Sequence, residues 1–259
     1  MKLSVLMITK NAKEVIEEAL KSLKGLWDEP VIIDSGSKDG TLEIAKKFTN
    51  NVSSYPFQDN YSDVRNIGLS KVTGNWILVL DADERLSEEL KRKISVLIND
   101  RNTDGYWFRR KTFISTKEYL RYGLFYPDWQ LRLFRNKRGY YFKGAVHEQL
   151  TIPKRKTKEM PYDILHYPQH PKYTAFTDFS NLMPYVHIHA DNLVKSSNNI
   201  LLLCLEGMAQ FVNLFFGGFL RGKGFLDGWN GFRAHLIFAS SIALAYILAG
   251  WEKTKIALK

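Results

Sequence analysis

Short apolar runs alternate with segments of helical periodicity along the first 80 residues. The apolar runs predict strands at residues 3–8, 30–33, 52–55 and 76–80. Apolar residues at helical spacing predict helices at residues 12–23, 41–48 and 63–70. Strands that alternate with helices imply a mostly parallel sheet with right-handed crossovers and flanking helices. The pattern therefore predicts an α/β fold of Rossmann-like type.

The fourth predicted strand ends in three carboxylates, Asp81, Asp83 and Glu84. Open α/β sheets bind ligands at the carboxyl ends of their strands. Asp81 and Asp83 point the same way if the extended geometry continues, because side chains alternate along a strand. Two carboxylates on one side suit Mg²⁺ or Mn²⁺ shared with substrate phosphates. The alternative is a solvated acidic turn before a helix capped by Ser87, and Glu84 fits that alternative.

Polar loops also follow the first two predicted strands, at residues 9–11 and 34–41. Asp34 comes directly after a buried strand and can accept a hydrogen bond from a ribose hydroxyl or a base N–H. Gly36 and Gly40 permit a tight turn there, and Ser37 and Asp39 are better explained as turn and helix-cap residues. Neither a dinucleotide-binding glycine motif nor a P-loop occurs. The three loops should converge on one nucleotide-binding crevice.

Four blocks, at residues 5–11, 32–41, 63–69 and 76–84, resemble in order and spacing the inverting family 2 glycosyltransferases. These are GT-A enzymes that use nucleotide-activated sugars. The resemblance implies that Thr9, Asn11 and Asp34 hold the nucleoside. It further implies that Arg65 lies near the diphosphate, that Asp83 holds the metal, and that Asp81 lies nearer the ribose or sugar; a metal role for Asp81 follows only from the carboxylate pair described above.

Two further blocks, at residues 126–135 and 144–148, resemble the WaaE-like transferases that add glucose or heptose to the lipopolysaccharide inner core. Asp128 matches the catalytic base of many family members, which takes the proton of the acceptor hydroxyl. Glu148 is the alternative candidate for the base. His147 is a further candidate catalytic residue, or an additional ligand of the metal or the diphosphate. The Q-x-x-R-W block of processive members is missing, which favours addition of a single sugar.

The composition of the chain indicates an anionic binding partner and a reducing compartment. The 259 residues carry a formal net charge of +10 and the single cysteine Cys204, so no intramolecular disulfide can form. Without a nucleic-acid-binding motif, anionic lipid and phosphorylated glycan fit the charge better than nucleic acid. The chain starts inside its first strand, so no signal segment is expected.

The C-terminal part has a different composition, and the basic stretch 153–158 suggests the boundary. The predicted domains are a catalytic GT-A domain at 1–160 and a helical, membrane-associating or acceptor-side region at 161–259. Its apolar runs cover residues 200–220, interrupted by polar side chains, and 236–249, about 14 residues against the ~20 that span a bilayer. Amphipathic helices lying in the headgroup layer are favoured; packing on the catalytic domain or a homo-oligomer interface is the alternative.

Together these features predict a metal-dependent, inverting hexosyl- or heptosyltransferase that uses a UDP- or ADP-sugar. Its acceptor would be a lipid-linked glycan, such as lipopolysaccharide core, in cell-envelope biosynthesis. It would bind peripherally at the cytoplasmic face of the inner membrane. A nucleotidyltransferase, which would release pyrophosphate, and a catalytically silent membrane scaffold are the alternatives.

Overall fold

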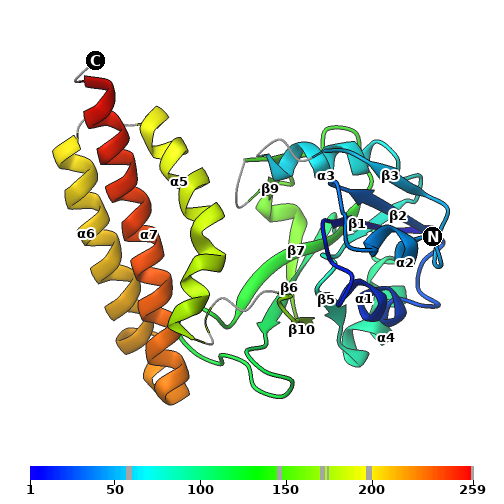
Figure 1. Ribbon diagram of the computed structural model, residues 1–259. Helices are drawn as coiled ribbons and strands as arrows, with labels where there is room; N and C mark the ends of the chain where they lie inside the picture. The colour runs from blue at the N-terminus through cyan, green and yellow to red at the C-terminus, as the bar shows by residue number, and fades with distance from the viewer. Residues whose placement is uncertain (57–59, 145–147, 170–172, 174, 197–199, 258–259) are drawn as a thin grey trace. The chain divides into compact units, whose positions relative to one another are not determined.

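The computed structural model describes residues 1–56, 60–144, 148–169, 173, 175–196 and 200–257 (Figure 1). The chain divides into two units. The sheet unit comprises Met1–Lys111 and Asp128–Gln169, and the helical unit comprises Thr112–Pro127 and His170–Lys259. The segment Thr112–Pro127, here called the arm, therefore belongs to the helical unit although both of its neighbours in sequence belong to the sheet unit.

The N-terminal half of the sheet is parallel, with strand order β3-β2-β1-β4. Its strands are β1 (Leu3–Thr9), β2 (Glu29–Asp34), β3 (Val52–Ser54) and β4 (Trp76–Val79). The connecting helices are α1 (Ile16–Ser22), α2 (Thr41–Ala45) and α3 (Tyr61–Leu69). Every strand and helix expected in the first 80 residues is present, and α1 and α2 are both shorter than predicted.

The other half of the sheet continues from β4 as β7-β6-β10-β5. These strands are β5 (Glu84–Leu86), β6 (Gly105–Thr112), β7 (Asp128–Arg135) and β10 (Thr157–His166). The pairs β4–β7, β6–β7 and β5–β10 are antiparallel, so the eight-stranded sheet is mixed. The predicted α/β, GT-A-like fold with a helical C-terminal region is confirmed, and the strands β1 through β4 form the predicted parallel part of the sheet.

The sheet has an apolar core on each face because its strands alternate their side chains. Leu3, Val5 and Met7 of β1 join one core with α1 and with α4 (Glu88–Leu97). Leu6 joins the other core with Val64 of α3. Ser87 caps α4, as expected, by accepting a hydrogen bond from the Leu90 N–H at 3.2 Å.

The predicted division at residue 160 falls inside β10, which pairs with β5 from Ile164 to His166. The basic stretch before it forms a 3-10 turn, η1 (Lys154–Lys156), and leads directly into this strand. The remaining short strands, β8 (Phe142–Lys143) and β9 (Gln149–Leu150), pair with each other. The sheet unit therefore extends to Gln169.

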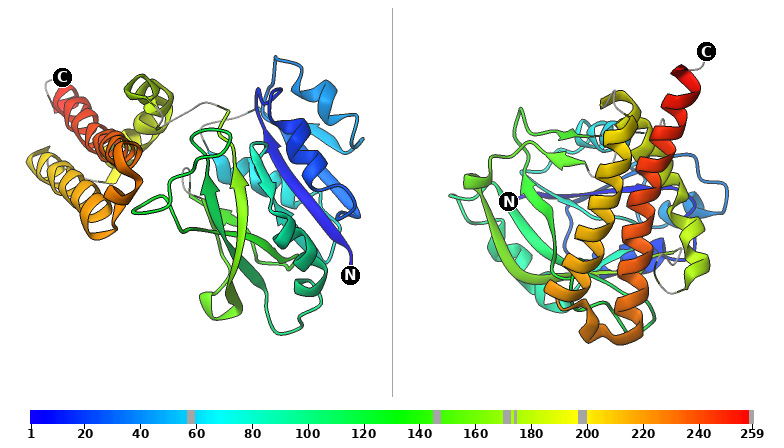
Figure 2. Two further views of the ribbon diagram at one scale, coloured as in Figure 1. Left: turned by 90° about the horizontal axis from the view of Figure 1, so that it is seen from below. Right: turned by 90° about the vertical axis from the view of Figure 1, so that its left-hand side faces the viewer.

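The helical unit is built around α5 (Met183–Ser196), α6 (Ile200–Phe216) and α7 (Gly228–Ala257). Shorter elements are η2 (Phe176–Leu182), the π-helical η3 (Gly217–Arg221) and η4 (Gly224–Asp227). Helices α6 and α7 run side by side (Figure 2), and Gly207 permits their close approach because a Cβ there would lie 2.8 Å from Cβ of Tyr246.

Two helical segments, Ile200–Arg221 and Gly224–Lys255, are long and apolar enough to cross a membrane. This corrects the expectation that the second apolar run is too short, because the helix extends well beyond residues 236–249. Buried residues make up 17% of the apolar stretch of the first segment and 44% of that of the second. Length and composition are weak grounds for spanning, since core helices of soluble proteins meet the same criteria.

Candidate active site

The ends of β1 and β2 carry two buried polar side chains with unused hydrogen-bonding capacity. Thr9 and Asp34 are partners in the parallel register of these strands, and both are buried. Oδ2 of Asp34 accepts from the N–H groups of Gly36 and Ser37, both at 3.0 Å. Oδ1 of Asp34 and Oγ1 of Thr9 have no hydrogen-bond partner among the described residues. Because buried polar atoms are normally paired, these two atoms are candidates for hydrogen bonds to a polar ligand.

The loops after β1 and β2 are held together by side-chain hydrogen bonds. Asn11 adopts a left-handed conformation with φ of 49°, and its Oδ1 accepts from the Lys38 N–H at 2.8 Å. Its own N–H donates to Ser37 Oγ at 2.8 Å. Asp39 Oδ1 accepts from the Thr41 N–H at 3.0 Å, but the N-cap residue of α2 is Gly40 and not Asp39 as expected. These contacts hold the two loops together beside Asp34.

The acidic segment after β4 forms a closed turn in which Glu84 is fully buried. The Asp81 N–H donates to Glu84 Oε2 at 3.1 Å, and the Glu84 N–H donates to Asp81 O at 3.0 Å. The expectation that Glu84 belongs to a solvated turn is therefore wrong. A buried carboxylate needs charged partners, and Glu84 has two, Arg110 and Arg132.

Two arginines hold the carboxylate of Asp81, one at each oxygen. Nη2 of Arg65 donates to Oδ1 at 2.9 Å, and Nη2 of Arg132 donates to Oδ2 at 2.7 Å. Burial alone would raise the pKa of Asp81, but the charges of Arg132 and Arg65 outweigh it and hold this pKa well below its usual value. Asp81 therefore stays ionised, and both of its oxygens are occupied by guanidinium groups.

These contacts belong to a longer series of alternating charges, here called the ion-pair chain. Its members in order are Glu148, Arg65, Asp81, Arg132, Glu84, Arg110 and Asp128. Arg132 bridges Asp81 and Glu84, with 2.7 Å to each, and Arg110 reaches Glu84 at 3.5 Å and Asp128 at 2.7 Å. The two rival bases thus lie at opposite ends of one network.

Each candidate base is itself ion-paired. Asp128 begins β7, and its Oδ1 also accepts from Gln130 Nε2 at 2.7 Å. The Asp128 side chain is 27% exposed and that of Glu148 is 14% exposed. Glu148 Oε1 accepts from Arg65 Nε. Asp128 is therefore the more accessible of the two to an incoming hydroxyl group.

Asp83 has a different partner from Asp81. Its Oδ2 lies 3.3 Å from Nε2 of His166, the last residue of β10. Among the described residues, no cluster of three or more His, Cys, Asp or Glu side chains could hold a metal alone. One carboxylate and one imidazole nevertheless fit Mn²⁺ or Mg²⁺ when a ligand supplies further oxygens. His147, the predicted extra ligand, lies outside the described residues.

Four residues of the site were not expected from the sequence: Glu84, Arg110, Arg132 and His166. The sequence contained a recognisable signal for one of them, Arg132. Asp128, Gln130 and Arg132 alternate along β7 and therefore share one face of the sheet. For Arg110 and His166 the signal was weak, because their roles depend on strand pairings between distant parts of the sequence.

Comparison with known proteins agrees with this architecture. The model of Glycosyl transferase family 2 matches residues 4–156. An uncharacterized glycosyltransferase of Rickettsia conorii is 26% identical over 245 residues, which cover 92% of this chain and 86% of that protein. One of Rickettsia prowazekii is 35% identical over 105 residues, which cover 40% of this chain but only 36% of that protein.

Among solved structures, S. aureus TarS 1–349 is similar with a TM-score of 0.49 and 17% identity, over 98% of this chain and 92% of that chain. A longer TarS structure gives a TM-score of 0.48 and 17% identity, over 75% of this chain and 39% of that chain. At these values the structural likeness carries no argument about function.

The family match extends over more than half of the chain and contains every member of the ion-pair chain. The protein belongs to glycosyl transferase family 2. It is a glycosyltransferase of α/β, GT-A-like fold, and this membership favours glycosyl transfer over nucleotidyl transfer.

Proposed function

We propose that this protein transfers a single sugar, with inversion, from a nucleotide-sugar donor to a hydroxyl group of a lipid-linked glycan. The donor would be a UDP- or ADP-sugar, and the acceptor a phosphorylated glycolipid such as lipopolysaccharide core. The sugar would be a hexose or heptose, and the reaction would take place at the cytoplasmic face of the inner membrane.

The proposal rests on two buried oxygens at the ends of β1 and β2 that have no hydrogen-bond partner in the part of the chain that the structure describes, Oγ1 of Thr9 and Oδ1 of Asp34. Asp34 can accept from a base N–H or a ribose hydroxyl, and Thr9 can donate or accept beside it. Without such a ligand these atoms remain desolvated, which proteins normally avoid. A nucleoside supplies the matching polar edge, and Asn11 completes the rim of its site.

The diphosphate would lie near Arg65, whose Nη1 is buried without a partner among the described residues. The ion-pair chain contains one more carboxylate than guanidinium groups, and Asp83 adds another negative charge nearby. A diphosphate is therefore repelled unless a cation accompanies it. Asp83 and His166 would hold Mg²⁺ or Mn²⁺, and when bound the cation neutralises the charge that develops on the departing nucleoside diphosphate.

Asp128 would act as the base. Inverting transfer needs one group to take the proton from the acceptor oxygen as the bond to the anomeric carbon forms. Arg110 holds Asp128 through Nε at 2.8 Å and Nη2 at 2.7 Å to the same oxygen, Oδ2. Among the described residues, Oδ1 accepts from the neutral Gln130 amide. Asp128 thus has a fixed orientation and one oxygen that is less strongly neutralised.

The membrane assignment is supported by one face of the segment Ile200–Arg221. Six large apolar side chains recur there at intervals of three or four residues and are 46–69% exposed: Leu201, Leu205, Met208, Val212, Phe216 and Leu220. Such a stripe is about 30 Å long at the helical rise of 1.5 Å per residue. Arg221 and Lys223 follow it. An apolar face ending in cations fits attachment to an anionic lipid surface.

A thermal-shift screen tests the nucleotide part of the proposal. Nucleoside diphosphates and nucleotide sugars of each base are added with and without Mn²⁺, and wild type is compared with Asp34→Ala. Wild type should be stabilised by one nucleotide class, more strongly with Mn²⁺, because ligands that bind the folded state raise its melting temperature. The variant should lose this response. No response to any nucleotide would contradict the proposal.

A further inference from the structure

The arm, Thr112–Pro127, connects β6 to β7 and packs within the helical unit. Its ends are adjacent, because Arg110 of β6 is the register partner of Asp128 of β7. Asp128 is the first residue after the arm. The arm is therefore joined directly to the end of the hairpin that carries the Arg110–Asp128 ion pair.

One carboxylate of the helical unit binds the backbone of the arm. Oδ2 of Asp227, in η4, accepts from the N–H groups of Arg121 at 2.8 Å and Tyr122 at 3.1 Å. The next residue continues the attachment, because the Gly123 N–H donates to Gly222 O at 2.8 Å. Hydrogen bonds from backbone N–H groups to a carboxylate are about twice as strong as neutral ones. Asp227 thus holds two consecutive amides of the arm.

A buried histidine of α7 holds the following part of the arm. His235 is fully buried, and burial lowers its pKa below the ordinary value, which keeps the ring neutral. Its Nδ1 then donates to Gly231 O at 2.7 Å, and its Nε2 accepts from the Leu124 N–H at 3.3 Å. A side chain at Gly123, Gly218 or Gly224 would collide with the ring. The imidazole therefore occupies a closely fitted position between the arm and the turn before α7.

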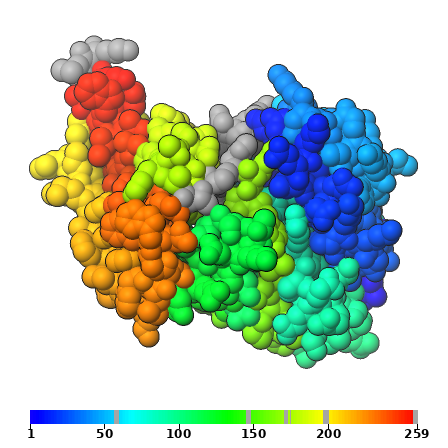
Figure 3. Space-filling view, turned by 60° about the horizontal axis from the view of Figure 1, so that its bottom comes forward, coloured from blue at the N-terminus to red at the C-terminus, as the bar shows by residue number. Residues whose placement is uncertain are grey.

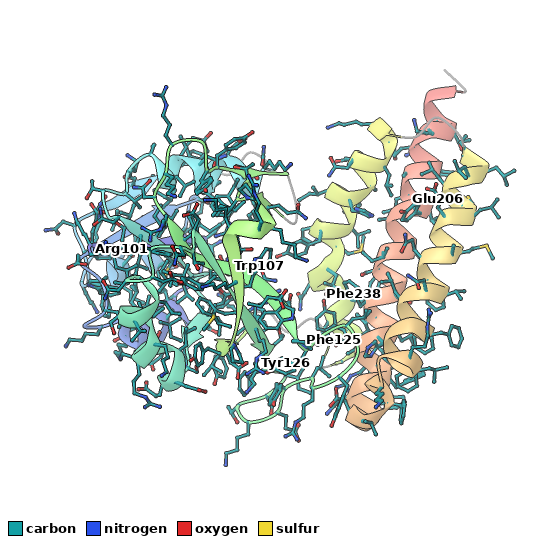
Figure 4. All side chains as sticks on the ribbon, turned by 180° about the vertical axis from the view of Figure 1, so that it is seen from behind. Arg101, Trp107, Phe125, Tyr126, Glu206 and Phe238 are labelled. Atoms are coloured by element: carbon teal, nitrogen blue, oxygen red, sulfur yellow. The ribbon has the colours of Figure 1, made fainter. Side chains whose placement is uncertain are left out.

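An aromatic cluster completes the attachment. The Phe125 ring lies 4.9 Å from those of Tyr173 and His235 and 6.1 Å from that of Phe238, measured between centroids. Figure 4 shows Phe125 beside Phe238, and Figure 3 shows the green surface of the arm against the orange start of α7. Phe125 is buried with Leu120 and Ala234. The arm is therefore a fixed part of the helical unit.

We propose that Asp227 and His235 are positioning residues for glycosyl transfer: they hold the arm to the helical unit, and through it they set the position of Asp128 relative to a lipid-linked acceptor. This inference rests on the proposed function. It gives the helical unit a second role besides membrane attachment, because it makes the unit part of the acceptor side of the reaction. The proposed donor site at Thr9 and Asp34 belongs to the sheet unit and makes no use of residues of the arm.

Hydrogen exchange on the full-length protein tests the attachment without any substrate. In Asp227→Ala the amides of Arg121 and Tyr122 lose their acceptor, and their exchange should accelerate about tenfold or more. Asp227→Asn keeps an acceptor oxygen and should restore most of the protection. Glu252→Ala removes an exposed carboxylate that pairs with Lys255 near the other end of α7, and it is the matched control. Unchanged exchange in Asp227→Ala would overturn the attachment.

Activity tests the positioning. Using the nucleotide sugar that stabilises the protein best, transfer to a lipid extract of bacterial membranes is compared with transfer to water. Asp227→Ala should lower transfer to lipid about tenfold while hydrolysis stays within about twofold, and Asp227→Asn should recover transfer. An equal fall in both reactions, or none in either, would overturn the positioning role.

A second variant guards against a folding defect. If Asp227→Ala does not fold, His235→Leu removes the acceptor of the Leu124 N–H from a different element and should give the same selective loss; a normal ratio of transfer to hydrolysis would overturn the inference. Failure of the proposed function itself looks different, because then no nucleotide sugar is turned over by wild type, while the exchange result still stands.

Discussion

Arg132 is almost fully buried, and its Nη2 donates a hydrogen bond of 2.7 Å to Asp81 Oδ2. The same nitrogen lies 2.7 Å from Glu84 Oε1. The pKa of Arg132 is raised above its ordinary value because the charges of Asp81 and Glu84 outweigh the effect of burial. This arginine therefore joins the acidic turn after β4 to β7, the strand that begins with Asp128.

Replacing Arg132 by Met should expose how much the site depends on it. The change leaves two carboxylates, Asp81 and Glu84, without their shared partner, and breaking a buried ion pair in this way costs about 3–5 kcal/mol. Urea unfolding should show a loss of this size. Arg101→Met, at an exposed arginine, is the control and should stay within about 0.5 kcal/mol of wild type. Equal stability of the two variants would show that the contacts of Arg132 with Asp81 and Glu84 do not stabilise the fold.

Asp83→Asn tests the cation site. It keeps the shape of the side chain but removes the charge that would attract a divalent ion beside His166. Stabilisation by Mn²⁺ in the presence of the nucleoside diphosphate should be lost, and turnover of the donor should fall by orders of magnitude, with folding retained. Melting curves with and without Mn²⁺ give the first result independently of activity. Full activity of wild type after complete chelation would refute a role for the metal.

Two isosteric variants separate the candidate bases. Asp128→Asn should abolish transfer to the acceptor yet leave nucleotide binding close to that of wild type, because the amide cannot take the proton. Glu148→Gln should instead weaken nucleotide binding, since Glu148 holds Arg65. Isothermal titration with the nucleoside diphosphate and a transfer assay distinguish the two. If Glu148→Gln alone abolishes transfer with normal binding, the base belongs to the Glu148 segment.

If the exposed apolar face of α6 attaches the protein to a membrane, a charge on that face should prevent the attachment. Met208→Glu places a charge in the middle of the exposed stripe and should abolish flotation with vesicles containing phosphatidylglycerol. Asn192→Glu adds the same charge at an exposed position of α5 and is the control. High salt should weaken wild-type attachment only partly, because apolar contact is not screened. Unchanged flotation of Met208→Glu, together with a change in oligomeric state by light scattering, would assign the stripe to a contact between copies.

Point substitutions are preferable to truncation for this purpose. Removal of the chain after about residue 195 would delete α6 and α7 and, with them, the partners of the arm, including Asp227 and His235. A truncated protein would therefore lose membrane attachment and the position of the arm together.

Tyr106 provides a test of the sheet core through pH. Burial, and then the nearby Asp100 carboxylate, raise the pKa of Tyr106 from 10.0 to about 12, and its hydroxyl donates to Asp100 Oδ2 at 3.0 Å. The folded state thus keeps a proton that the unfolded chain loses, so stability present below pH 10 declines as pH rises toward 12. Tyr106→Phe should flatten this decline in urea unfolding across that range. An unchanged slope would contradict the assignment.

The sequence was sufficient for the parallel half of the sheet because its strands are uninterrupted apolar runs, such as Trp76–Val79, and polar residues stand directly after them. Thr9, Asp34 and Asp81 could be found in this way. The antiparallel half was harder, because β6 and β7 carry buried or half-buried charges, Arg110 and Arg132, that look like solvent-facing residues. Glu84 looked solvated for the same reason, since its burial depends on arginines from strands later in the chain.

The helical unit shows the same limit. Its apolar runs could be recognised in the sequence. That the arm belongs to the helical unit could not, because this depends on hydrogen bonds between residues more than 100 positions apart, such as Arg121 and Asp227. Helix length was underestimated because Trp229, Arg233 and Lys253 flank the apolar run with residues that look like helix ends, whereas α7 continues from Gly228 to Ala257.

The central claim is sugar transfer from a nucleotide sugar bound at Thr9 and Asp34. It is tested most directly by mass spectrometry of the products formed from UDP- and ADP-sugars with Mn²⁺ and bacterial membranes. We predict stoichiometric release of the nucleoside diphosphate and appearance of the sugar in the lipid-extractable fraction, both lost in Asp34→Ala. Release of pyrophosphate, or no consumption of any nucleotide sugar by the folded wild-type protein, would contradict the account.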